Sequence, residues 1–215
     1  MRNIDGSSGL LDIADHLVLP AIMLAATAFS AVFGITIGIA SGYLGGRLDT
    51  LIMRLVDIML AFPYILLAIV IVGSLGPGLF NAMLVIGIAG IAFYVRMMRS
   101  LVVAIREEVF VEAARAAGAS NLYIMRRSIL PALVPYIIVF CSLNVGFLIL
   151  ETASLSFLGL GAQPPTAEWG SMLSESRQYL TLSPHVVLIP GAAILLIVVV
   201  LNLFGDALDV RLKES

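Results

Sequence analysis

Charged residues divide the chain into long apolar stretches. No Asp, Glu, Lys or Arg occurs at positions 17–46, 58–95, 128–150 or 178–205. A membrane-spanning helix needs about 20 mostly apolar residues, so three of these stretches hold one span each. The stretch 58–95 is interrupted at 73–78 by Gly-Ser-Leu-Gly-Pro-Gly, a sequence that favours a turn, and therefore holds parts of two spans. The pattern predicts five spans, at residues 17–43, 50–72, 79–98, 132–150 and 186–205.

The composition supports a membrane location. Hydrophobic residues make up 60% of the 215 positions and charged residues only 12%, and the mean hydropathy is +1.08. A soluble domain would carry about 25% charged residues, so a soluble enzyme is excluded and an all-α integral membrane protein in contact with lipid is predicted. The net charge of −2, with scattered basic residues, predicts no nucleic-acid partner. The single cysteine, Cys141, cannot form an intrachain disulfide.

Basic residues set the predicted topology. Ten of the twelve Lys and Arg residues fall at positions 47–54, 96–127 and 211–213, and only Arg2 and Arg177 lie elsewhere. Positive charge accumulates on the cytoplasmic side of membrane proteins, so these three segments are assigned to the cytoplasm.

Two terminal segments follow from this topology. Residues 212–215 form a cytoplasmic tail, and residues 1–16 form an extracytoplasmic segment. Residues 1–16 lack the pattern of a signal peptide, and a further span upstream would explain an external N-terminus.

The predicted cytoplasmic loop, residues 99–130, contains two short helices. Residues 107–117 are rich in helix formers and begin with acidic residues, which the helix dipole favours. Gly118 is suited to a left-handed helix end with positive φ. Ser120 can cap a second helix at 121–130, and Pro131 leads into the next span. The alternative is a solvated loop in which Glu112 pairs with Arg115.

Three further residues carry charge near or inside the predicted spans. Arg54 and Asp57 lie three residues apart on one helix face, where they can neutralise each other. Glu151 lies at the outer end of a span. An acid at such a position is a candidate for the transport pathway, and the alternative is a hydrated residue at the membrane boundary.

Glycine and proline predict local packing and breaks. Gly34, Gly38 and Gly42 repeat every four residues, a pattern of close helix contact, either within the bundle or against a sister subunit. Pro63 and Pro190 are expected to kink their helices. Residues 152–167, with several glycines and prolines, are predicted as a re-entrant or surface segment.

Several motifs resemble those of a known family. Glu112-Ala113-Ala114, followed by Gly118 and then Leu130-Pro131, resembles the EAA signature of ABC-importer permeases, with Ser128 where that signature usually has isoleucine. Residues 42–49, 54–63 and 153–170 are similar to the dipeptide/oligopeptide/nickel permeases, and within these to the second of two permease subunits. The resemblance covers residues 17–211. These permeases normally carry an upstream span and a Gly-Arg-Asp segment, which this sequence lacks.

The resemblance implies an architecture and a set of partners. It implies a type I ABC-importer permease-like bundle over residues 17–211, in the bacterial inner membrane. The expected partners are a second homologous permease, two cytoplasmic ATP-binding subunits and an extracytoplasmic substrate-binding protein. The cargo would be dipeptides or oligopeptides, with nickel as the alternative. The residues expected to couple to the ATPase are Glu112, Ala113, Ala114, Ala117, Gly118, Ala119 and Ser120.

The residue inventory argues against an enzyme. The only lysine is Lys213, so no phosphate-binding Gly-x-x-x-x-Gly-Lys loop exists, and the two histidines do not form a zinc-protease motif. We therefore expect no catalytic residues, cofactor or metal, and ATP hydrolysis in separate subunits. The alternative function is a secondary transporter or channel not coupled to ATP. That class would place ionisable groups near the bilayer midplane, and between Asp57 and Arg96 only tyrosines could serve.

Overall fold

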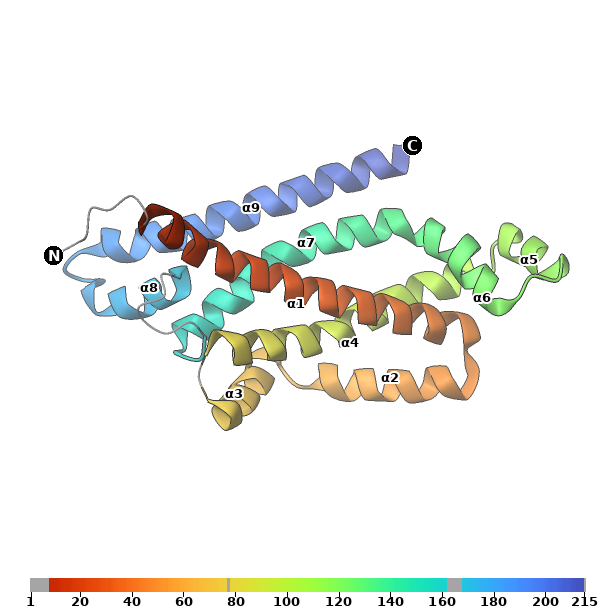
Figure 1. Ribbon diagram of the computed structural model, residues 1–215, viewed down its shortest axis with the longest axis horizontal. Coiled ribbons are helices and arrows are strands. Elements are labelled where there is room, and N and C mark those ends of the chain that lie inside the picture. Colours follow the sequence, from red (N-terminus) through yellow and green to blue (C-terminus); the bar gives the residue numbers. More distant parts are fainter. Residues whose placement is uncertain (1–7, 77, 162–167, 215) are drawn as a thin grey trace.

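The computed structural model describes residues 8–76, 78–161 and 168–214, and this part of the chain is almost entirely helical. Residues 1–7 of the predicted N-terminal segment, residues 162–167 of the predicted surface segment and residue 215 lie outside the described residues. The helices form an elongated bundle with α5 and α6 at one end and α8 at the other (Figure 1). Their bounds are α1 Ser8–Leu44, α2 Gly46–Ala61, α3 Tyr64–Leu75, α4 Leu79–Ile105, α5 Val109–Ala116, α6 Asn121–Ile124, α7 Leu130–Phe157, α8 Trp169–Ser176 and α9 Pro184–Glu214.

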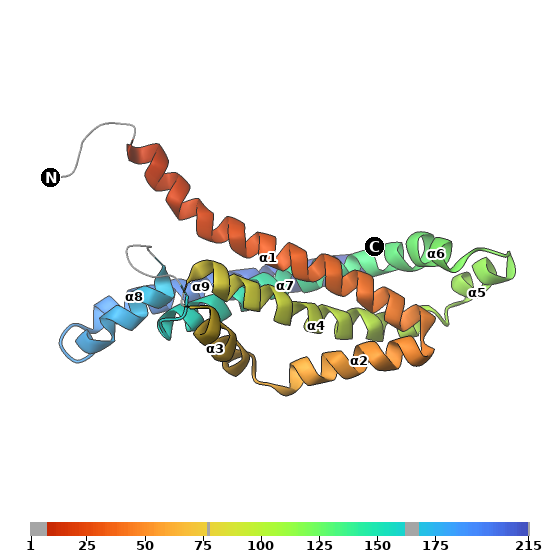
Figure 2. The ribbon, with the colours of Figure 1, turned by 60° about the horizontal axis from the view of Figure 1, so that its bottom comes forward.

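Four helical segments of the described chain are long and apolar enough to cross a membrane: Ala25–Leu44, Met83–Ile105, Asn121–Phe157 and Pro184–Val210. Helices α2 and α3 supply a fifth if they count as one span, with a bend of 86° between them. The bend occurs at Pro63, which has no N–H for a helical hydrogen bond and follows the extended residue Phe62. Figure 2 shows the two helices turning away from each other at this break. The predicted membrane-spanning helical bundle is therefore confirmed, with four unbroken candidate spans and one bent helix pair.

Helices α1 and α4 pack against each other through the glycine repeat. A β-carbon added at Gly38 would lie 2.8 Å from Cβ of Met98, and one at Gly42 would lie 2.8 Å from Cβ of Val102. Gly34 faces Tyr94 in the same way, one turn further along. Because no side chain stands between them, the two backbones approach closely, and Met98 and Val102 are fully buried. Of the two contacts predicted for this repeat, the structure shows the one within the bundle.

The helix ends differ from those expected from charge alone. Helix α4 runs to Ile105, seven residues beyond the predicted end at 98, and α1 begins at Ser8. Two arginines within α4, Arg96 and Arg99, are paired with carboxylates of α2, so their charges do not end the helix. The helical segment that crosses the membrane therefore continues into the predicted cytoplasmic loop, and residues 8–16 are part of the first helix.

The second short helix predicted at 121–130 is not a separate element. Residues 121–157 form one continuous helix, in which α6 passes through a π-helical turn, Met125–Ile129, into α7. The π turn ends two residues before Pro131, whose ring would clash with the carbonyl of Arg127 in a regular α-helix.

The outer end of α7 also extends beyond the predicted span. The helix continues to Phe157, so residues 152–157 are helical, which corrects their prediction as a surface or re-entrant segment. Thr152, Leu155 and Ser156 are buried there. Helix α8 packs closely on this end, because a β-carbon at Gly170 would lie 2.7 Å from Cα of Ala153. The contact with α8 supports the additional turns of α7, and the pattern of apolar and polar residues does not reveal such a contact.

Candidate functional site

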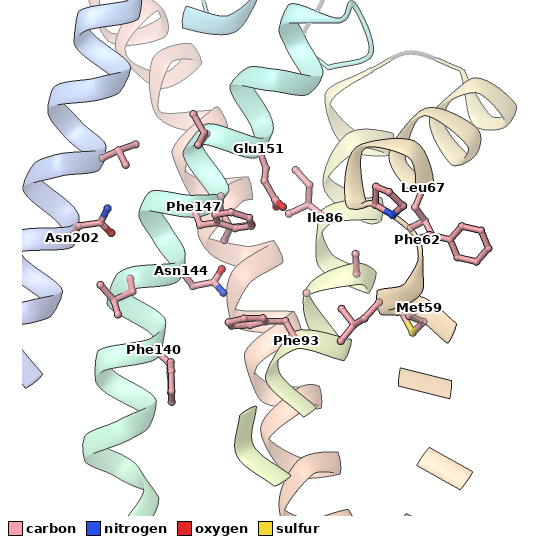
Figure 3. Close-up of a pocket in the computed structure, with 18 residues that line it drawn as sticks. Met59, Phe62, Leu67, Ile86, Phe93, Phe140, Asn144, Phe147, Glu151 and Asn202 are labelled. Atoms are coloured by element: carbon pink, nitrogen blue, oxygen red, sulfur yellow. The ribbon is translucent and has the colours of Figure 1, made fainter. Parts of the chain in front are cut away.

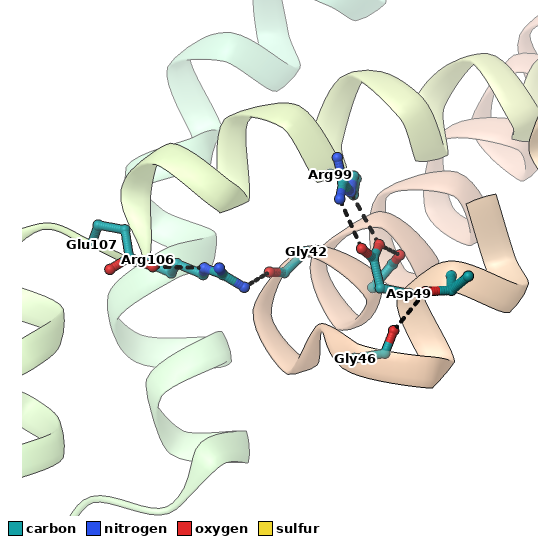
Figure 4. A network of polar contacts seen from close by, with 8 residues as sticks. Gly42, Gly46, Asp49, Arg99, Arg106 and Glu107 are labelled. Atoms are coloured by element: carbon teal, nitrogen blue, oxygen red, sulfur yellow. Dashed lines mark hydrogen bonds and ion pairs between the residues drawn. The ribbon is translucent and has the colours of Figure 1, made fainter.

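The connection between α1 and α2 contains the motif at residues 42–49. Gly45 and Gly46 both have φ of +63°, a conformation that glycine adopts without steric cost, and the chain reverses there. Asp49, in the first turn of α2, accepts hydrogen bonds from Ser41 Oγ at 2.6 Å, from Arg99 Nε at 3.0 Å and, through its second oxygen, from Arg99 Nη2 at 2.7 Å. Figure 4 shows this bidentate pair. The motif therefore ties α1, α2 and α4 together at one end of the bundle.

The predicted pairing of Arg54 with Asp57 is wrong. Asp57 instead forms an ion pair with Arg96 of α4, and Arg54 is exposed on α2. The side chains of Arg96 and Asp57 are 46% and 55% exposed, so this pair contributes at most about 1 kcal/mol. The Asp49 and Arg99 side chains are 16% and 35% exposed, and their bidentate pair is the stronger connection between α2 and α4. Arg54 and Asp57 were predicted as possible pathway or structural residues; the contact with Arg96 gives Asp57 a structural role, and a pathway role for either residue stays a prediction.

The predicted coupling loop turns at Gly118. Gly118 has φ of +80°, as the sequence predicts, and it follows the last turn of α5. The amide of Ala119 donates to the carbonyl of Ala114 at 3.1 Å, and the amide of Gly118 donates to the carbonyl of Arg115 at 3.0 Å. These two bonds form a Schellman motif with glycine at its left-handed position. Ser120 then caps α6, accepting from the amide of Tyr123 at 3.3 Å.

A buried cluster holds α5 against the bundle. Val111 of α5 is fully buried together with Ile124 and Ile129, and the cluster also includes Ile39 and Tyr43 of α1. The loop is thus a fixed part of the bundle, attached through its apolar side chains.

Polar contacts reinforce this attachment. The hydroxyl of Tyr43 donates to Oδ1 of Asn121 at 3.2 Å, and the guanidinium of Arg115 lies 6.0 Å from the centre of the Tyr43 ring. Arg106, which follows α4, donates to the carbonyl of Gly42 at 2.9 Å and pairs with Glu107 (Figure 4). The α5 loop is therefore attached to α1 and α4 by polar contacts as well as by apolar ones.

The predicted coupling residues fall into two groups. Ala114 and Ala119 are partly buried and pack against the cluster around Val111, so their side chains support the loop. A charge at Ala114 would disturb the fold of this chain, which makes that position a poor probe of a partner. The remaining predicted residues are exposed, namely Glu112, Ala113, Ala117, Gly118 and Ser120.

Two exposed apolar residues of α5 were not predicted. Val109 is 78% exposed and Phe110 is 47% exposed. Val109, Ala113, Ala116 and Ala117 lie at helical spacings of four, seven and eight residues, on one face of α5. We call these four residues and Phe110 the α5 surface. An apolar Val-Phe pair within a predicted cytoplasmic helix was the sequence signal that could have identified it.

A cavity of about 790 Å³ lies between α7, α9 and the helices α2 to α4 (Figure 3). Eighteen residues line it, and most are apolar, including Phe93, Phe140 and Phe147. Its polar side chains are those of Glu151 and Asn144 on α7 and Asn202 on α9. The break between α2 and α3 contributes Phe62 and Pro63 to the wall. The cavity has the size and largely apolar lining of a small-molecule site.

The structure places Glu151 inside α7 and not at its outer end. Six residues of the helix follow Glu151, and its side chain is partly buried and lines the cavity. A role for Glu151 in the transport pathway stays a prediction, and the structure adds that its side chain faces this cavity. Across residues 8–76, 78–161 and 168–214, no group of three or more His, Cys, Asp or Glu side chains is arranged to hold a metal ion.

Comparison with known proteins identifies relatives of the whole bundle. A dipeptide transport system permease protein of Alkalihalophilus pseudofirmus is 49% identical over 187 residues, which are 85% of this chain and 62% of that relative. A glutathione transport system permease protein of Pectobacterium atrosepticum is 44% identical over 201 residues, covering 90% of this chain and 67% of the relative. The chain therefore matches about two thirds of the length of these relatives.

The fold is also that of a solved transporter. A chain of the inward-facing MetNI methionine ABC transporter superposes with a TM-score of 0.75, covering 97% of this chain and 99% of the other at 19% identity. A second MetNI crystal form gives a TM-score of 0.67 at 22% identity. At these identities the likeness shows the fold alone, here that of a chain of an ABC transporter. Residues 34–214 match the family described as binding-protein-dependent transport system inner membrane component, and the chain belongs to that family.

Proposed function

We propose that the chain is a permease subunit of an ABC importer for peptides and forms half of the translocation pathway. The α5 surface carries this proposal, because it presents apolar side chains at the end of the bundle that the positive-inside rule assigns to the cytoplasm (Figure 1). The family match and the dipeptide and glutathione names of the relatives support it. Both cargoes are peptides, whereas no name among these relatives supports nickel.

The α5 surface is the proposed docking site for a cytoplasmic ATP-binding subunit. Exposed Val109 and Phe110 would bury apolar area in a cleft of that subunit, while Ala113, Ala116 and Ala117 allow close approach. The cluster around Val111 would transmit motion of α5 to α1 and α4. Because the chain has no phosphate-binding loop of the usual kind, ATP hydrolysis is assigned to these partners.

The other proposed partners cover the remaining surfaces. A second, homologous permease would complete the pathway, and an extracytoplasmic binding protein would deliver the peptide at the α8 end. Large apolar side chains of α9 remain exposed in the isolated chain, among them Leu195, Leu196 and Leu203. Such a surface is expected to contact lipid and the sister subunit.

Reconstitution of the importer tests this function. The chain is co-purified with its partner permease, ATPase and binding protein, and the complex is placed in liposomes that contain ATP. Uptake of a labelled dipeptide is expected only with the loaded binding protein outside and ATP inside. Omission of either should remove uptake. Uptake that persists without ATPase or ATP would instead support a secondary transporter or channel.

A further inference from the structure

The cavity beside α7 combines one acidic group with apolar walls. Among the eighteen described residues that line it, Glu151 alone carries a charged side chain, and no lysine or arginine lies among them. A carboxylate in apolar surroundings is costly unless a cation or hydrogen-bond donors compensate it. The cavity therefore favours a ligand that brings a positive charge with it.

Asn144 adds a second polar point on the same helix. Asn144 and Glu151 are seven residues apart, which places them on one face of α7 and about 10 Å apart along its axis. Figure 3 shows both side chains pointing from α7 toward α4. An extended chain of three residues spans about 10–11 Å, so a short peptide can reach from one side chain to the other.

We propose that Glu151 binds the α-ammonium group of a peptide in transit, and that Asn144 hydrogen-bonds the peptide backbone about two helical turns deeper. This inference rests on the proposed function of peptide import. The ammonium donates N–H bonds to the carboxylate, and these charge-assisted bonds are strengthened by the apolar surroundings. The amide of Asn144 can donate to a peptide carbonyl and accept from a peptide N–H.

The remaining walls suit variable side chains. The aromatic rings of Phe93, Phe140 and Phe147 offer apolar contact without directional hydrogen bonds. A site that reads the amino terminus and backbone, and presents apolar walls elsewhere, accepts peptides of differing sequence. It discriminates instead against peptides whose amino terminus is blocked.

The first test removes the charge and keeps the shape. Glu151→Gln is compared with wild type in the reconstituted importer, using one tripeptide with a free amine and its N-acetylated form. A hydrogen bond to a charged group strengthens binding by a factor of about 10 or more. Uptake of the free-amine peptide should therefore fall about tenfold in Glu151→Gln, whereas uptake of the acetylated peptide should fall by less than about twofold. Asp206→Asn, an exposed residue of α9 that does not line the cavity, is the matched control and should leave both rates unchanged.

A second test restores the charge chemically and does not depend on the binding protein accepting the acetylated peptide. Glu151→Cys, in a Cys141→Ser background, is treated with anionic or cationic methanethiosulfonates of similar size. The anionic adduct should recover free-amine uptake, and the cationic adduct should not. Equal uptake for wild type and Glu151→Gln, or equal effects of both adducts, would overturn this inference alone. A wild-type complex that imports neither peptide would instead contradict the proposed function.

Discussion

Replacing Gly118 by valine is expected to abolish peptide uptake while leaving the protein inserted in the membrane. The residue adopts φ of +80° at the end of α5, and a left-handed backbone costs an L-residue about 1–2 kcal/mol. Among the described residues, apart from the two that adjoin Gly118 in the chain, no atom would lie within 4 Å of a β-carbon there, so the described bundle has room for a side chain. The expected damage is therefore confined to the path of the loop and to the α5 surface.

The variant Gly118→Asn distinguishes the effect of backbone strain at this position from the effect of adding a side chain. Asparagine tolerates the left-handed region better than other residues with a side chain, so it should retain much of the ATPase association that valine loses. Both variants are measured by co-purification of the ATPase and by uptake, with membrane abundance as the control for insertion. Full association and uptake with valine would show that this turn has no part in coupling.

Gly38→Val is expected to destabilise the whole bundle. A β-carbon at Gly38 would lie 2.8 Å from Cβ of Met98 and 2.9 Å from the carbonyl oxygen of Val95. Neither atom can move without displacing α4. The loss of folding stability in Gly38→Val should therefore reach or exceed the upper end of the usual range for overpacking, about 1–3 kcal/mol. The prediction is a lower thermal unfolding midpoint in detergent and less protein in the membrane.

Gly73→Val is the matched control for that substitution. Gly73 also lies within a helix, α3, but outside its own helix backbone no atom of the described residues would lie within 4 Å of a β-carbon there. The thermal unfolding midpoint of the Gly73→Val variant should stay close to that of wild type. Equal midpoints for the Gly38 and Gly73 variants would contradict the close α1–α4 contact.

The sequence predicted the spans better than their ends. Uninterrupted apolar length is a local property, and it located the helices that can cross a membrane. The ends depended on whether charged residues stop a helix, and that depends on partners far away in sequence. Arg96 and Arg99 find carboxylates 39 and 50 residues away, so α4 continues past both. Without those partners in view, the cluster of charges that begins at Arg96 placed the predicted boundary at residue 98.

In the candidate site too, features set by local sequence were predicted, whereas features that depend on distant contacts were not. The positive φ of Gly118 and the cap at Ser120 are local and were predicted. The partial burial of Ala114 depends on the cluster that includes Ile39 and Tyr43, on another helix, and was not predicted. The cavity around Glu151 combines residues from α2 to α9, and only the folded bundle brings them together.

The central claim is that the α5 surface faces the cytoplasm and receives an ATPase subunit. Single cysteines at Ala116 on α5 and at Leu182, which is 81% exposed between α8 and α9, are introduced in a Cys141→Ser background. In inside-out vesicles, an impermeant thiol reagent should label the cysteine at position 116 and not that at position 182, and added ATPase subunits should block the labelling. Labelling at position 182 from the cytoplasmic side, or labelling at position 116 that the ATPase does not reduce, would contradict the account.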